Sequence, residues 1–170
     1  MKLHIGGTET KHGWTILNVV PGPHVDIVGS CTDLSAFADG SVEEIYASHV
    51  VEHLGHRDEL KPALGEFHRV LAPGGRVAIS VPDIVTLSRL MGSDDLNVGQ
   101  RYEIMLMMFG GQLDAFDFHK VGLFDELLAL FLLNAGFKNP QRVDGFGLFD
   151  DYSSHRFGDT PISLNMIAVK

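Results

Sequence analysis

The sequence has almost no cysteine, an excess of acidic over basic residues, and no long apolar stretch. Cys31 is the one cysteine among 170 residues, which excludes an internal disulfide and fits a reducing compartment, the cytoplasm. The chain has 13 Lys and Arg and 22 Asp and Glu, which gives a net charge of -9. We therefore expect neither nucleic acid nor a membrane surface as a partner. No apolar run reaches the ~18 residues that cross a bilayer. The start MKLHIGG lacks the basic and apolar regions of a secretion signal.

What is present is the composition of a folded domain. Hydrophobic residues make up 45% and charged residues 21% of the chain, which excludes a disordered tail. The length suits one hydrophobic core, and we expect a single domain over residues 1–170.

The order of the expected elements predicts an α/β fold. Residues 58–71 carry apolar side chains at three- and four-residue steps, the stripe of an amphipathic helix. This helix lies between strands expected at 43–48 and 76–81, with Pro73-Gly74-Gly75 before the second, so the unit is βαβ and the sheet is doubly wound and mostly parallel. Further strands are expected at 2–5, 15–20, 25–28, 141–143 and 163–169, and further helices at 99–109 and 124–134. The last strand should be antiparallel, at or near the edge, and the helix after the first strand is shortened or missing.

Ligands of such sheets bind beyond the carboxyl ends of the strands. The polar segments at those ends are 6–9, Asn18, 30–33, 48–53 and Pro82-Asp83. These segments form the candidate site.

Four stretches carry a resemblance to a known family: LHIGG followed by HGW, DGSVEEIYASHVVEHL, GEFHRVLAPGGRVAISVPD, and LLNAGF ahead of SLNMIAVK. With these the chain resembles the small class I methyltransferases that use S-adenosylmethionine, the type 11 group. The resemblance implies a Rossmann-like fold, S-adenosylmethionine as the cofactor, and transfer of its methyl group to an acceptor.

The resemblance also implies cofactor-binding positions. The glycine turn that holds the methionine end falls at Gly6-Gly7-Thr8, with Thr8 where the family has a second required glycine. The ribose acid falls at Asn18, and the adenine-side acid at Ser30 or Asp33. Apart from the resemblance, the polar residue Ser48 at the end of the strand expected at 43–48 is a further candidate cofactor-binding residue.

Methyl transfer needs alignment of the reactants, and a base only where the acceptor carries a proton. His49 and His119 are the candidate catalytic bases, although each also fits a structural or surface role. Asp83 is the candidate for holding acceptor hydroxyls or amines, or else the cap of a following helix. We expect a small-molecule acceptor bearing a hydroxyl, amine or sugar-linked group.

Three other hypotheses remain open. The same fold could persist as a binding or assembly module, with Thr8, Asn18 and Ser30 marking the loss of cofactor-binding groups. The string His49-Val50-Val51-Glu52-His53 also matches the H-x-x-E-H signature of inverted zinc peptidases, although its place after a buried strand disfavours zinc hydrolysis, and we assign no metal. The apolar run 105–109 could pack a core, line an acceptor pocket or contact a second copy in a homodimer.

Overall fold

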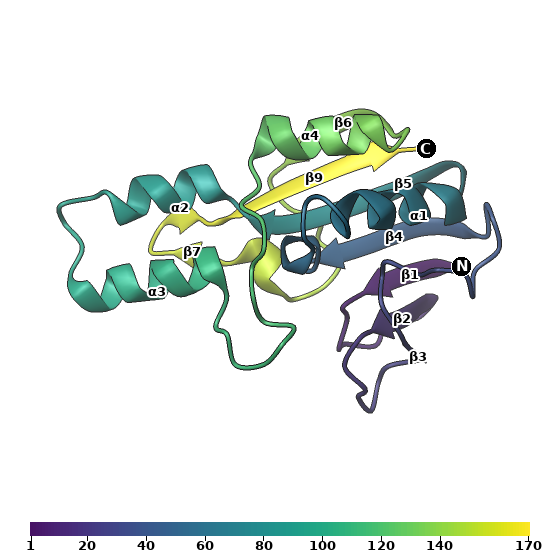
Figure 1. The fold of residues 1–170 in the computed structure, drawn as a ribbon, viewed down its shortest axis with the longest axis horizontal. Coiled ribbons are helices and arrows are strands. Elements are labelled where there is room, and N and C mark those ends of the chain that lie inside the picture. The colour runs from purple at the N-terminus through teal and green to yellow at the C-terminus, as the bar shows by residue number, and fades with distance from the viewer.

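A computed structural model describes residues 1–170. Its main feature is a seven-stranded sheet in the order β3-β2-β1-β4-β5-β9-β6 (Figure 1). The strands are β1 (Lys2–Ile5), β2 (Trp14–Asn18), β3 (Ile27–Val28), β4 (Val42–Ser48), β5 (Leu71–Pro82), β6 (Lys138–Val143) and β9 (Ser163–Val169). The first five are parallel, and β9 runs antiparallel between β5 and β6. The predicted mostly parallel α/β sheet is confirmed, and its last strand lies next to the edge strand.

Two helices cover one face of this sheet, as Figure 1 shows. They are α1 (Leu60–Val70) and α4 (Asp125–Asn134). The apolar stripe that predicted α1 is its buried side, and it joins the inward side chains of the strands in a core of 27 buried residues. Both predicted helices are therefore confirmed within two residues of their expected ends.

A smaller helical unit lies beyond the carboxyl end of β5. It consists of α2 (Ile84–Met91) and α3 (Val98–Phe109), which pack on each other around Leu87, Ile104 and Ile162. A short hairpin of β7 (Arg156–Phe157) and β8 (Thr160–Pro161) follows the 3-10 turn η2 (Tyr152–Ser154). The other 3-10 turn, η1 (Val51–His53), comes directly after β4.

The segment Pro73-Gly74-Gly75 belongs to a strand, where the sequence predicted a break before one. β5 begins at Leu71, which pairs with Val42, and the register then shifts so that Arg76 pairs with Glu44. The extra residues form an irregularity on the β5 side of this pair. Such a bulge admits proline and glycine without ending the strand.

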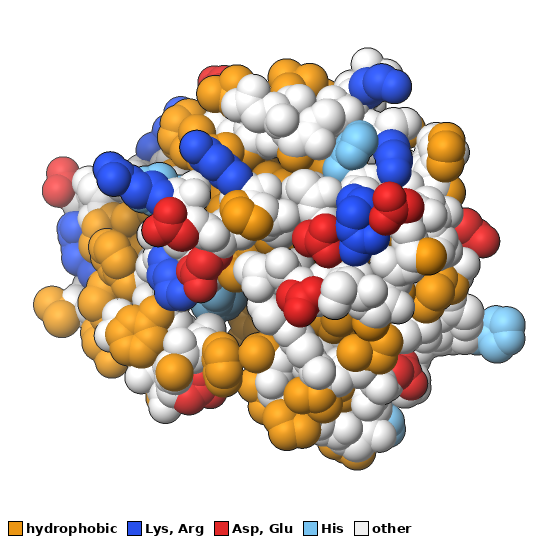
Figure 2. All heavy atoms as spheres, turned by 45° about the vertical axis from the view of Figure 1, so that its right-hand side comes forward, with side chains coloured by type: hydrophobic (Ala, Val, Ile, Leu, Met, Phe, Trp, Pro, Cys, Tyr) orange, Lys and Arg blue, Asp and Glu red, His pale blue; other side chains and the backbone are white.

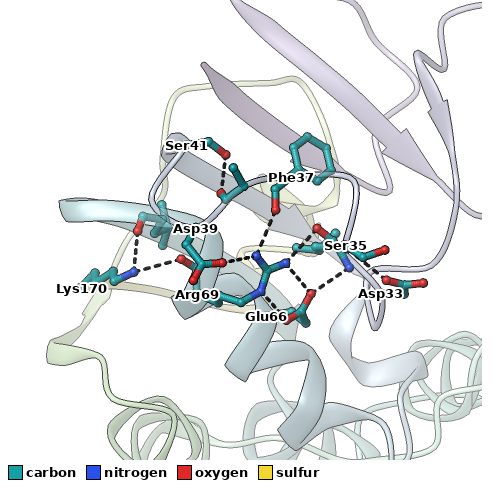
Figure 3. A network of polar contacts seen from close by, with 11 residues as sticks. Asp33, Ser35, Phe37, Asp39, Ser41, Glu66, Arg69 and Lys170 are labelled. Atoms are coloured by element: carbon teal, nitrogen blue, oxygen red, sulfur yellow. Dashed lines mark hydrogen bonds and ion pairs between the residues drawn. The ribbon is translucent and has the colours of Figure 1, made fainter.

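No helix connects β1 to β2, β2 to β3 or β3 to β4, as predicted for the first connection. The β3–β4 connection is instead held by Arg69 of α1, the centre of the network in Figure 3. Its guanidinium donates to the backbone carbonyls of Leu34 (2.9 Å) and Phe37 (3.0 Å), and it pairs with Glu66 (2.7 Å) and Asp39 (2.6 Å). The β3–β4 connection is thus held in place by the side chain of Arg69, without a helix of its own.

The opposite face of the sheet is covered by an aromatic cluster. His4 and Tyr46 project from β1 and β4, and Phe149 of the segment 144–155 packs on both, with ring centroids 4.0 and 5.1 Å away. The Tyr46 hydroxyl donates to Asp151 Oδ2 at 2.8 Å. Trp14 completes the cluster from β2, 6.3 Å from the ring of His4.

Charges of both signs are interspersed on the face that Figure 2 shows, where acidic and basic side chains lie beside one another. The acidic excess therefore forms no single patch on this face. No helix of the structure is long and apolar enough to cross a bilayer.

Candidate functional site

The carboxyl ends of β1, β2, β3 and β4 surround a cavity of about 330 Å³, called the first cavity here. Its lining includes Gly6, Asn18 and Ser30 at the strand ends, and Phe116 and Lys120 of the segment after α3. The surface is hollowed between hydrophobic side chains in the view of Figure 2. The expected hollow at the strand ends is open.

The glycine turn after β1 depends on close packing. Gly6 has φ +75°, and a Cβ there would lie 2.4 Å from Cγ2 of Val50. A Cβ on Gly7 would lie 2.4 Å from Nδ1 of His4. Thr8 is exposed and lines a second, polar cavity of about 230 Å³ together with Gly7 and other residues. Both glycines are therefore required by contacts, and Thr8 leaves the turn accessible.

Asn18 lies in the first cavity, but its amide also has partners within the protein. Nδ2 donates to the carbonyl of Gly7 at 3.1 Å, and Oδ1 accepts from the amide of Val20 at 2.9 Å. The side chain therefore ties the glycine turn to the end of β2. One amide hydrogen and one lone pair remain for a ligand.

Of the two candidates on the adenine side, the structure brings only Ser30 into the first cavity. Ser30 Oγ lies 2.8 Å from Thr32 Oγ1. Asp33 is exposed, lines neither the first nor the second cavity, and accepts from the amide of Ser35 at 3.0 Å. This bond and the Ser35 side chain hold the pKa of Asp33 below its usual range. Figure 3 places Asp33 at the margin of the Arg69 network.

Ser48, the remaining predicted cofactor-binding residue, lies at the end of β4 and lines the second cavity. Its hydroxyl oxygen is buried without a hydrogen-bond partner. The second cavity also contains Gly6 and His49 and thus adjoins the first.

A third cavity of about 680 Å³ lies between α3, the segment 110–119 and η2. His49 and His53 line both this cavity and the first, while Met107, His119 and Tyr152 line the third. The two predicted bases therefore face one space. The sequence had left the role of Met107 open, and here it contributes to the wall of this cavity.

His49 is held in one orientation. Its backbone has φ 52°, rare for a residue with a side chain. Ser163 Oγ donates to the carbonyl of Tyr152 at 2.8 Å, so it accepts from His49 Nε2 at 3.0 Å. Nδ1 then points to Glu52 Oε1 at 3.3 Å. Both ring nitrogens of His49 are engaged by the protein.

His119 has a free nitrogen. Its Nδ1 is buried and has no hydrogen-bond partner. Burial lowers the pKa of His119, and the charge of Glu52 opposes this shift. A neutral imidazole with an unshared lone pair is the form that accepts a proton.

Glu52 is a residue of this site that the sequence analysis did not assign to methyl transfer. Its side chain is 1% exposed, and neither carboxylate oxygen has a hydrogen-bond partner. Nδ1 of His49 lies 3.3 Å from Oε1, but a buried carboxylate without hydrogen bonds is costly to the folded protein, which makes Glu52 a candidate functional residue. The sequence signal that could have identified Glu52 is its position in the motif that runs from His49 to His53.

The oxygens of Asp83, the residue predicted to hold an acceptor, are occupied by the protein. They accept from the amides of Val85 (3.1 Å) and Thr86 (3.2 Å), and from Arg142 at 2.8 Å. Asp83 is buried and caps α2, the alternative that the sequence left open. Its neighbour Pro82 lines the third cavity, and Asp83 does not.

The fold and the cavities at its strand ends define the class of protein as a class I methyltransferase fold. The family model described as a methyltransferase domain matches residues 16–79. This match, together with the solved structures below, confirms the resemblance to class I S-adenosylmethionine-dependent methyltransferases. It is also in line with the cofactor predicted from the sequence. No curated protein matches the sequence.

Three solved structures illustrate the likeness of fold. One is a SAM-dependent methyltransferase from Archaeoglobus fulgidus, with 16% identity, 99% of this chain and 85% of that chain covered, and a TM-score of 0.61. A second is the Burkholderia thailandensis 1,6-didemethyltoxoflavin-N1-methyltransferase with bound 1,6-didemethyltoxoflavin and S-adenosylhomocysteine. It has 18% identity and a TM-score of 0.62, with 99% of this chain and 69% of that chain covered. The third is the N-methyltransferase NodS from Bradyrhizobium japonicum WM9 with S-adenosylhomocysteine. It has 15% identity and a TM-score of 0.50, with 92% of this chain and 65% of that chain covered.

Proposed function

We propose that the protein transfers a methyl group from S-adenosylmethionine to a small-molecule acceptor. The observation that carries this proposal is the meeting of the first and third cavities at His49 and His53. One cavity is bounded by the ends of the parallel strands, and the other opens beside it. A transfer reaction needs this arrangement, with two ligand sites sharing a wall.

The first cavity suits the nucleoside part of the cofactor. Leu17, Val19 and Val20 offer apolar contacts, and Asn18 and Ser30 offer hydrogen-bonding groups beside them. Gly6 lets the backbone approach closely where a Cβ would meet Val50. Two of the structures with a similar fold contain S-adenosylhomocysteine, which supports this choice of ligand.

The cofactor supplies an activated methyl group on its sulfonium, so the protein mainly positions the reactants. His119 is the proposed proton acceptor for a hydroxyl or protonated amine, because its Nδ1 has no hydrogen-bond partner and the residue lines the third cavity. The proposed task of His49 is positioning, since its nitrogens are bound by Ser163 and Glu52.

Calorimetric titration with S-adenosylmethionine and S-adenosylhomocysteine tests the binding half of the proposal. We expect a dissociation constant near micromolar, which corresponds to a binding free energy of about -8.2 kcal/mol. Gly29 lines the first cavity, and a Cβ there meets nothing within 4 Å, so Gly29→Leu is expected to fill the cavity and weaken binding at least ~10-fold. Gly65→Leu is the matched control, because Gly65 is on α1, away from the cavities, and also has open space. Absence of heat at millimolar ligand would refute the proposal.

Turnover is measured separately, as S-adenosylhomocysteine formed with a panel of small hydroxyl and amine acceptors. The second candidate function, a non-catalytic binding module, is favoured by one observation: the Asn18 amide is already used to hold the glycine turn. Absence of detectable heat with either cofactor form, together with absence of turnover across the panel, would support that module.

A further inference from the structure

We propose that Glu52, His53 and His119 form a binding site for a divalent transition-metal ion, of which Zn²⁺ is the type case. The three side chains each offer one ligand atom, and these atoms all lie within 4.8 Å of one another. Two imidazoles and a carboxylate are the protein ligands of several zinc sites that keep a position open, and of non-haem iron sites. The inference concerns metal binding alone and does not depend on methyl transfer.

The two segments that carry these ligands are fixed to each other by backbone hydrogen bonds. The carbonyl of Glu52 accepts from the amides of Lys120 (2.8 Å) and Val121 (3.3 Å). A third bond, between the amide of His119 and the carbonyl of Phe109 (3.1 Å), anchors the other side of this loop. The backbone segments that carry the ligands are therefore held together without an ion, and only the side chains need to close on one.

His53 has the hydrogen bond that a metal-binding histidine usually has. Its Nδ1 lies 3.2 Å from the carbonyl of Phe118 and donates to it, which leaves the lone pair on Nε2. Metal-bound histidines commonly donate their second ring nitrogen to a carbonyl or carboxylate in this way. The ring of His53 meets that of His119 edge to face, with centroids 4.8 Å apart.

The remaining two ligands are buried polar groups that lack partners. Both oxygens of Glu52 and Nδ1 of His119 are buried without a hydrogen bond. An ion would bind one of the Glu52 oxygens and Nδ1 of His119 at the same time. Around a tetrahedral ion, ligand atoms at about 2.1 Å from the metal are about 3.4 Å apart, so a pair at the 4.8 Å limit of the cluster would close by about 1.4 Å.

His49 offers a competing explanation for the buried carboxylate. Its Nδ1 is 3.3 Å from Oε1 of Glu52, so a protonated His49 could pair with it. The pair leaves Oε2 of Glu52 and Nδ1 of His119 without partners, whereas an ion bound through Oε2 and Nδ1 accounts for both. His49 is not one of the three ligands, so this arrangement differs from the H-x-x-E-H zinc signature, in which the two histidines bind and the glutamate is the base.

The proposal affects the role of His119. Nδ1 cannot hold a metal ion and accept a proton at the same time, so its proposed action as a base belongs to the metal-free protein. The ion would sit in the wall of the third cavity, which His53 and His119 line.

The test is a titration of the chelator-treated, full-length protein with Zn²⁺, followed by calorimetry, and with Co²⁺, followed by its visible absorption. We expect one ion per chain, and a Co²⁺ spectrum of a site with nitrogen and oxygen ligands. Glu52→Gln and His119→Ala should each weaken Zn²⁺ binding by at least ~100-fold, since loss of supporting groups alone costs 10- to 100-fold. His56→Ala is the control, because His56 is exposed, close in sequence and outside the cluster, and it should bind as the wild type does.

Two results would overturn the proposal. One is binding no tighter than millimolar, which would leave the His49 pair as the explanation of Glu52. The other is binding that survives Glu52→Gln and His119→Ala but is lost in His56→Ala, which would identify an adventitious surface site. Circular dichroism of the metal-free variants shows whether each is folded. If one is not, the other variant and the Co²⁺ spectrum of the wild type decide the question.

Discussion

Acidification should destabilise the protein through His4, a histidine buried between the sheet and Phe149. Burial lowers the pKa of His4 to about 4 from 6.5, and the nearby charge of Asp151 only partly opposes this. The unfolded chain therefore binds a proton between these two values while the folded protein does not, so the His4 contribution is complete above pH 6.5 and is lost as the pH falls toward 4. At pH 5 the loss is about 2 kcal/mol relative to neutral pH, and below pH 4 it approaches about 3 kcal/mol.

The assay is urea unfolding, followed by far-ultraviolet circular dichroism, at pH 7 and pH 5. Because carboxylates also titrate over this range, the quantity of interest is the difference between wild type and His4→Leu, which removes the titrating group and keeps an apolar side chain of similar size. The variant should lose about 2 kcal/mol less than wild type between the two pH values. His12→Leu, at an exposed loop position, is the control. Equal losses in wild type and His4→Leu would refute the reasoning.

Three further substitutions test other parts of the structure. Gly7→Ala places a Cβ 2.4 Å from the ring of His4 and should cost roughly 1–3 kcal/mol in urea unfolding, whereas Gly145→Ala, with open space around it, should change stability by less than about 0.5 kcal/mol. Arg69→Leu removes the donors that hold the β3–β4 connection and should cost roughly 2–4 kcal/mol, with increased proteolysis in residues 30–41. Asp83→Ala removes a helix cap and a buried ion-pair partner and should lower the free energy of unfolding by about 2–3 kcal/mol. Asp83→Asn keeps the cap and should lower it by about 1 kcal/mol. Equal losses in the two variants would contradict this division between cap and ion pair.

The elements with strong periodicity could be predicted from the sequence, because local pattern and tertiary packing favour the same structure there. Helix α1 is the clearest case, since its predicted stripe is its buried side. The start of β5 could not be predicted. Proline and two glycines usually end an element, and only the pairing of Leu71 with Val42 on a neighbouring strand keeps them in the sheet.

The candidate site was predictable in its location, because the ends of parallel strands must lie at one edge. Gly6, Asn18 and Ser30 were expected together and do line one cavity. Asp33 is engaged locally by the amide of Ser35, whereas the oxygens of Asp83 are occupied in part by Arg142, which is distant in sequence. The clustering of Glu52 with His119 was beyond prediction for the same reason, since a loop more than sixty residues away completes it.

The interior place of β9 has a consequence for synthesis of the chain on the ribosome. β5 and β6 each use β9 as a partner, through pairs such as Arg76 with Val169 and Arg142 with Met166. Until residue 169 has emerged, β6 has no partner in the sheet, and β5 exposes one row of unpaired backbone groups to neighbouring molecules. The nascent protein must therefore pass through a stage in which β5 can pair with another chain. Premature termination before residue 163 would keep it in that aggregation-prone state.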